Sequence, residues 1–171
     1  MSDKGSDDWR RITEDAYAKL PIGIRFSYTR TFSLADVAAF VAASGDFNPL
    51  HQDESHAKLR FGGLILPGLL TGSMLSHIGG LLGIVASEMH FEYLAPVYPG
   101  ETVTCTVRVV DREEARRVVV CAADFVNQAG AKVLKASFKG YRVEYGWWRM
   151  RLITRDEVKR RVASCGGKPG E

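Results

Sequence analysis

Cysteine is scarce in this sequence. Only three occur among 171 residues, Cys105, Cys121 and Cys165, and none of them forms a C-x-x-C pair or stands near a histidine at metal-ligand spacing. Three widely spaced thiols cannot form the disulfide framework of a small secreted protein, and they do not indicate a zinc site. We therefore expect three reduced thiols and no metal.

An excess of one charge sign is also missing. The chain has 23 Lys and Arg against 20 Asp and Glu, a formal charge of +3. This is too small to predict nucleic-acid binding by itself, but it suits a small anionic ligand. The first residues are polar and lack the apolar run of a secretory signal, so we expect a cytoplasmic protein.

No long run of purely apolar residues occurs either. The segment between Arg60 and Glu88 has no Asp, Glu, Lys or Arg, but it contains Pro67, His77, serines and seven glycines. A membrane-spanning helix needs about 20 predominantly apolar residues. The segment is only moderately apolar, so it predicts a buried helix of a soluble protein, running from Pro67 to about Val85.

Two stripes follow the predicted helix at helical spacing. One is apolar and consists of Leu70, Met74, Ile78, Leu81 and Val85. The other has almost no side-chain bulk and consists of Gly72, Ser76, Gly79 and Gly83. The second stripe predicts that something approaches the helix backbone closely, which leaves two candidates: a tightly wrapped sheet or an elongated ligand.

The remaining pattern is that of one α+β domain, because the length is close to a typical domain of about 150 residues and 46% of residues are hydrophobic. Apolar and polar residues alternate over 24–32, which predicts a strand. Ser33 with Asp36 predicts a capped helix that ends at Gly45, and Asp53 predicts the cap of a short helix. Four antiparallel strands are expected at 88–95, 101–110, 116–126 and 131–145. A single sheet packed on one helix leaves an exposed edge, which favours a dimer.

The loop between the first two helices holds the candidate chemistry. Asp46 and His51 are five residues apart, and the bend at Asn48-Pro49 can bring them to one side of a pocket. A carboxylate and an imidazole that share a water are the minimum apparatus for general acid–base addition of water. The same residues also favour a turn by their conformational propensity alone. The backbone N–H of Gly68, at a helix start, offers an anion site.

Residues 43–51 read ASGDFNPLH, and Ala57 follows six residues later. This run resembles the signature of the MaoC-like, R-specific enoyl-CoA hydratases, and the resemblance covers about residues 22–145. It implies a hot-dog fold, in which an antiparallel sheet wraps a long central helix, and a homodimer or dimer-based oligomer. Residues 1–21 are then an N-terminal lead-in. Residues 146–171 are a C-terminal extension whose last residues we expect to be disordered.

The resemblance also implies roles for individual residues. Asp46 and His51 would hold the catalytic water, Asn48 would shape the loop, and Ser76 would support it by hydrogen bonding. Gly68 would donate its N–H to the thioester oxygen. The implied reaction is reversible syn hydration of a trans-2-enoyl-CoA to an (R)-3-hydroxyacyl-CoA, and no cofactor or metal is implied.

One departure and several alternatives remain. Many members of the family have His-Gly where this chain has Pro67-Gly68, which alters the pocket wall and leaves acyl specificity open. The alternatives are a hot-dog acyl-CoA thioesterase, a dehydratase of branched, dicarboxylic or acyl carrier protein substrates, and a degenerate subunit that only binds acyl-CoA. No nucleic acid or membrane is expected as a partner.

Overall fold

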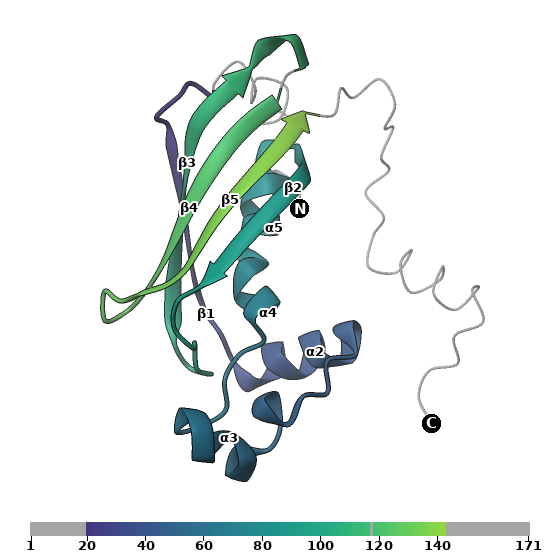
Figure 1. Ribbon diagram of the computed structural model, residues 1–171, viewed down its shortest axis with the longest axis vertical. Helices are drawn as coiled ribbons and strands as arrows, with labels where there is room; N and C mark the ends of the chain where they lie inside the picture. Colours follow the sequence, from purple (N-terminus) through teal and green to yellow (C-terminus); the bar gives the residue numbers. More distant parts are fainter. Residues whose placement is uncertain (1–19, 117, 143–171) are drawn as a thin grey trace, which may run out of the picture.

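The computed structural model describes residues 20–116 and 118–142, shown in Figure 1. Most of the lead-in and the C-terminal extension lie outside the described residues. The sequence also predicts a short helix near residues 13–19 and another capped by Thr154, and both of these predictions lie outside the described residues too. Within the described ranges, no helix is long and apolar enough to cross a membrane.

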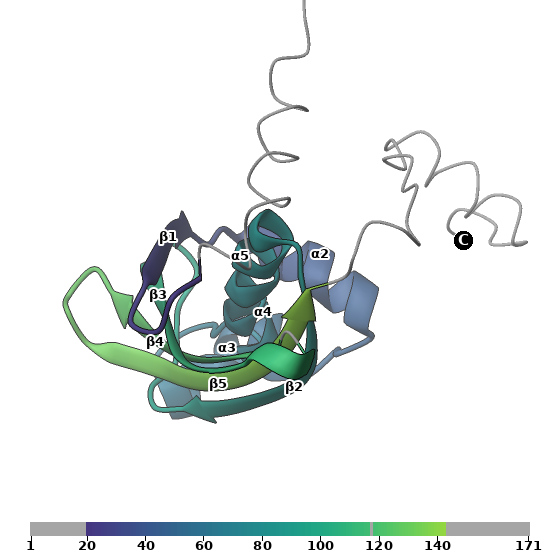
Figure 2. The ribbon, with the colours of Figure 1, turned by 90° about the horizontal axis from the view of Figure 1, so that it is seen from above.

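Five antiparallel strands form one sheet, in the order β1-β3-β4-β5-β2. Their bounds are β1 Arg25–Thr31, β2 Ile84–Tyr93, β3 Thr102–Glu113, β4 Val118–Asn127 and β5 Lys132–Arg142. Seen from above, the sheet curls around the helices α4 (Gly68–Gly72) and α5 (Met74–Leu82), while α2 (Leu34–Ser44) lies on their other side (Figure 2). The α+β arrangement of one sheet packed on a central helical segment is therefore confirmed.

Alternation along the strands places the core on the concave face. On β3 the alternate residues Val103, Cys105, Val107 and Val109 are all buried. On β5 the alternate residues Leu134, Ala136 and Phe138 are buried as well. β3 continues past its expected end through a register shift between Val109 and Asp111, and a single 3₁₀ turn, η2 (Glu114–Arg116), follows it.

The single long helix that the sequence predicts is wrong in two respects. It is divided into α4 and α5 at Ser73, whose hydroxyl donates to the carbonyl of Leu70 at 2.6 Å, and such a back-bond competes with the helical ladder. It also ends at Gly83, which has a φ of 63°, so Val85 belongs to β2. Leu70, Met74 and Ile78 of the expected stripe are buried, whereas Leu81 is 45% exposed.

The sheet approaches the helix backbone closely at Gly72, the first residue of the low-bulk stripe, whereas Ser76 in the same stripe is exposed. A Cβ on Gly72 would lie 2.9 Å from the ring of Phe91 on β2, and a Cβ on Gly68 would lie 2.6 Å from the ring of Tyr93. The two rings are stacked, with centroids 6.2 Å apart. At Gly72 the group that approaches the helix is therefore the wrapped sheet and not a ligand. Gly68 is approached by the same strand.

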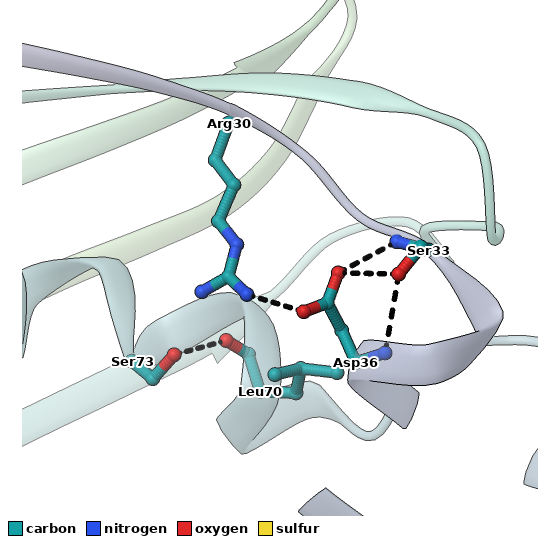
Figure 3. A network of polar contacts seen from close by, with 5 residues as sticks. All are labelled: Arg30, Ser33, Asp36, Leu70 and Ser73. Carbon is teal, nitrogen blue, oxygen red and sulfur yellow. Dashed lines mark hydrogen bonds and ion pairs between the residues drawn. The ribbon is translucent and has the colours of Figure 1, made fainter. Parts of the chain in front are cut away.

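The predicted start of α2 is confirmed. Ser33 and Asp36 form a reciprocal capping box, and Arg30 of β1 adds an ion pair to Asp36 at 2.6 Å (Figure 3). The hydrogen bonds from Ser33, with help from the Arg30 guanidinium, hold the pKa of Asp36 below its ordinary value of 3.8. This network joins β1 to α2 and so positions the loop that follows α2.

Candidate functional site

A cavity of about 730 Å³ lies between α2, the start of α4, the end of β2 and the start of β5. Its walls are mainly apolar, with Phe40, Leu66, Leu94 and Val133 among them. The volume falls in the usual range of small-molecule sites, and a few polar groups on apolar walls are typical of them. Of the residues predicted from the sequence, Asp46, His51 and Gly68 line this cavity.

The loop after α2 is shaped by its own short-range hydrogen bonds. Gly45 ends α2 with a φ of 73°, a left-handed conformation that glycine adopts without strain. The side chain of Asp46 then accepts from the N–H of Asn48 at 3.4 Å, and Asn48 accepts from the N–H of Leu50 at 3.1 Å. These turns lead into the 3₁₀ helix η1 (Pro49–His51), which carries His51 into the cavity wall.

His51 is buried, only 9% exposed, and its ring is fixed in one orientation. Its Nδ1 lies 2.8 Å from the carbonyl oxygen of Ile65. A carbonyl can only accept, so Nδ1 carries the proton in this contact and Nε2 of the neutral ring keeps its lone pair. In the neutral ring with this tautomer, Nε2 is the acceptor atom that faces the cavity, which suits a general base.

Asp46 faces that nitrogen from the other end of the loop. Its Oδ2 lies 3.6 Å from Nε2 of His51, and its side chain is 46% exposed. The separation is longer than a direct hydrogen bond, so a water can bond to both atoms at once. The carboxylate reaches solvent while the imidazole is buried, which places the pair between the cavity mouth and its interior.

Gly68 lies at the first residue of α4, after Pro67, which also lines the cavity. Within residues 20–116 and 118–142, the N–H of Gly68 has no acceptor, as expected for the first turn of a helix. Because α4 is only five residues long, any stabilisation of an anion here comes from the N–H groups of this turn and not from a long helix dipole.

The structure does not bring Ser76 to the loop. Ser76 is exposed on α5, beyond the break at Ser73, and it is not among the cavity-lining residues. In the described part of the chain, no hydrogen bond joins its side chain to residues 46–51. The described residues also hold no cluster of three or more His, Cys, Asp or Glu side chains that could bind a metal.

Two cavity residues were missed by sequence reasoning. Tyr93 closes the cavity beside Gly68, and partial burial raises the pKa of its phenol. Thr71 is one of only two polar residues below a tenth exposed in the described ranges, the other being His51. The threonine beside Leu69 and Leu70 in a segment without charged residues was an available signal for Thr71. Nothing in the strand pattern distinguishes Tyr93 from a core residue.

Comparison with known proteins finds relatives that are named as hydratases and dehydratases. The (R)-specific enoyl-CoA hydratase of Aeromonas caviae is 32% identical over 117 residues, 66% of this chain and 87% of the relative. The mitochondrial 3-hydroxyacyl-[acyl-carrier-protein] dehydratase of Arabidopsis thaliana is 33% identical over 103 residues, which cover 57% of this chain and 60% of that protein.

Among solved structures, unliganded R-hydratase PhaJ1 from Pseudomonas aeruginosa matches with a TM-score of 0.69 and 28% identity, over 75% of this chain and 85% of that one. The A. caviae (R)-hydratase has the same TM-score and covers 72% and 98%. The fold is thus the hot-dog fold of these hydratases, and residues 20–129 match the MaoC like domain. The chain belongs to the MaoC-like hydratase and dehydratase family.

Proposed function

We propose that the protein catalyses reversible syn hydration of a trans-2-enoyl-CoA to an (R)-3-hydroxyacyl-CoA. One observation carries the proposal: Nε2 of His51 and Oδ2 of Asp46 lie 3.6 Å apart, and both residues line the same cavity as Gly68. The hydratase names of the relatives support the same reaction class.

In the proposed hydration, a water bound to both groups attacks C3 of the enoyl thioester. Nε2 of His51 takes one proton from the water as its oxygen bonds to C3, and the electron pair of the C2=C3 bond moves toward the thioester oxygen. When the enolate collapses, C2 takes a proton from the same Asp46–His51 pair. Hydroxyl and proton therefore arrive on one face, and the sum is the addition of one water.

The negative charge that develops on the thioester oxygen needs a donor. The Gly68 N–H has no acceptor in the described residues and lines the same cavity, so we assign it to this oxygen. Preorganised donors of this kind are worth about 10²–10³ in rate. The apolar walls near Phe40, Leu66 and Val133 suit an acyl chain, and Asn48 acts by holding the loop turn.

The expected partner is a second copy of this chain at β2. On the helix side of this edge strand, Met89 and Tyr93 remain 40% and 51% exposed, and Leu81 of α5 remains 45% exposed. An uncovered strand edge with an apolar margin is normally paired or covered. We therefore expect a dimer in light scattering and a shift toward monomer in Met89→Glu.

The reaction is tested with purified protein and crotonyl-CoA or longer enoyl-CoA substrates. Loss of the enoyl thioester absorbance without release of free thiol, and an R-configured product, are expected. Thiol release would instead indicate the thioesterase. The same enoyl group on acyl carrier protein tests the carrier, and a faster reaction there would assign the chain to carrier protein substrates. Tight binding of acyl-CoA without turnover would indicate a non-catalytic subunit.

A further inference from the structure

Thr71 is a polar residue on an otherwise apolar part of the cavity wall. It lies in α4, three residues after Gly68, and is only 3% exposed. The other deeply buried residues of this wall include Leu66, Val97 and Leu134. A hydroxyl at this place does not stabilise an apolar core, because a buried polar group needs a hydrogen-bond partner.

The hydroxyl of Thr71 has no hydrogen-bond partner in the described residues, in contrast to two nearby helical serines. Ser73 Oγ donates to the carbonyl of Leu70 at 2.6 Å, and Ser44 Oγ donates to the carbonyl of Phe40 at 2.7 Å. The corresponding acceptor for Thr71 would be the carbonyl of Pro67, which already accepts two N–H groups, that of Leu70 at 2.9 Å and that of Thr71 itself at 3.5 Å. Thr71 therefore keeps its donor available inside the cavity.

The direction of the side chain brings this donor toward the proposed oxygen site. Cα–Cβ bonds in a helix tilt toward its N-terminus, so a residue covers the turn before its own Cα. For Thr71 that is the turn that begins at Gly68, and residues three apart share one face. Gly68 has no side chain to separate the two, and both residues line the cavity.

We infer that Thr71 is a catalytic residue whose hydroxyl donates a second hydrogen bond to the thioester oxygen, beside the Gly68 N–H. The inference rests on the proposed function, since it assigns a donor for the charge that hydration creates. An enolate oxygen has more than one lone pair, and sites for such oxygens commonly use two donors. An unoccupied, buried donor in the same turn meets that need.

The test compares Thr71→Val, which keeps the shape and removes the hydroxyl, with Thr71→Ser, which keeps the hydroxyl. Thr71→Val is expected to lower kcat by roughly 10²-fold with little change in KM, because the bond strengthens as charge develops. Thr71→Ser should retain most of the activity. Thr29→Val is the matched control, because Thr29 pairs with Thr104 at 2.9 Å on the exposed face of the sheet.

A spectroscopic measurement separates this role from simple packing. The thioester carbonyl of bound butyryl-CoA, which cannot be hydrated, should absorb at lower infrared frequency than free butyryl-CoA in the wild type, and the shift should shrink in Thr71→Val. An unchanged carbonyl shift, or a Thr71→Val loss confined to KM, would overturn the inference. A wild type without hydratase activity would refute the proposed function, whereas an active wild type with an equally active Thr71→Val refutes only the role of Thr71.

Discussion

Nε2 of His51 and Oδ2 of Asp46 lie 3.6 Å apart, too far for a direct hydrogen bond and close enough for one shared water. Two consequences follow for variants of the pair. Asp46→Asn and His51→Ala should each lower kcat for enoyl-CoA hydration by about 10²-fold or more. The double variant should be little worse than either single one, because the two groups act on one water.

This is measured by steady-state kinetics on crotonyl-CoA. His56→Gln serves as the control, because His56 is exposed on α3 (Glu54–Phe61) and outside the cavity lining. Unchanged turnover in both single variants would contradict the mechanism.

A second prediction concerns two helical glycines. Gly72→Ala should destabilise the protein by about 1–3 kcal/mol, because the new Cβ would lie 2.9 Å from the Phe91 ring and overpack the core. Gly80→Ala should instead stabilise it by about 0.4–1 kcal/mol, because nothing lies within 4 Å of that Cβ and alanine favours helix. Urea unfolding of both variants measures this, and equal shifts would show that the wrapped sheet does not exclude a side chain at Gly72.

The capping box predicts a pH dependence of stability. The pKa of Asp36 is lowered in the fold, chiefly by the Ser33 hydrogen bonds, so its ionised form stabilises the native state. This contribution is fully present above the ordinary value of 3.8 and is lost as pH falls through the lower folded pKa. The stability difference between wild type and Asp36→Asn should therefore be largest near neutral pH and shrink below pH 3.8. A difference that stays constant down to pH 2 would contradict this account.

Two thiols should be unreactive in the native protein. Cys105 and Cys121 are buried, and burial raises the pKa of each thiol to about 12. Because the thiolate is the nucleophile, iodoacetamide at pH 8 should leave both unmodified in the folded protein and modify both in urea. Peptide mass mapping distinguishes these sites from Cys165, and rapid native labelling of Cys105 would indicate that the sheet opens locally.

Much of this fold could be predicted from short sequence patterns, because the caps, turns and strands concerned depend on residues close together in the chain. The Ser33–Asp36 box and the left-handed Gly45 depend on residues within one helical turn, and the alternation of Val103 to Val109 depends only on which face is buried. The same holds for the Asp46–His51 loop, since its turns are closed by bonds of two residues' span.

The features that were missed depend on contacts far along the chain. Ser73 looks like any serine on a helix, and only the structure shows its hydroxyl back-bonded at the break. Tyr93 reaches Gly68 across 25 positions of sequence, so no local pattern reports that contact. The predicted contact between Ser76 and the loop is not seen in the structure, where Ser76 is exposed on α5 and outside the cavity lining.

The break at Ser73 also separates residues that line the cavity from residues that pack in the core. The helical residues that line the cavity, among them Gly68 and Thr71, all precede it, whereas Met74, Ile78 and Leu82 after it fill the core. Variation at Pro67 and Leu69, which line the cavity and have no proposed role in the chemistry, would therefore alter the cavity wall and leave the core residues of α5 unchanged. Ser73 therefore divides the helical residues that line the cavity from the α5 residues that fill the core.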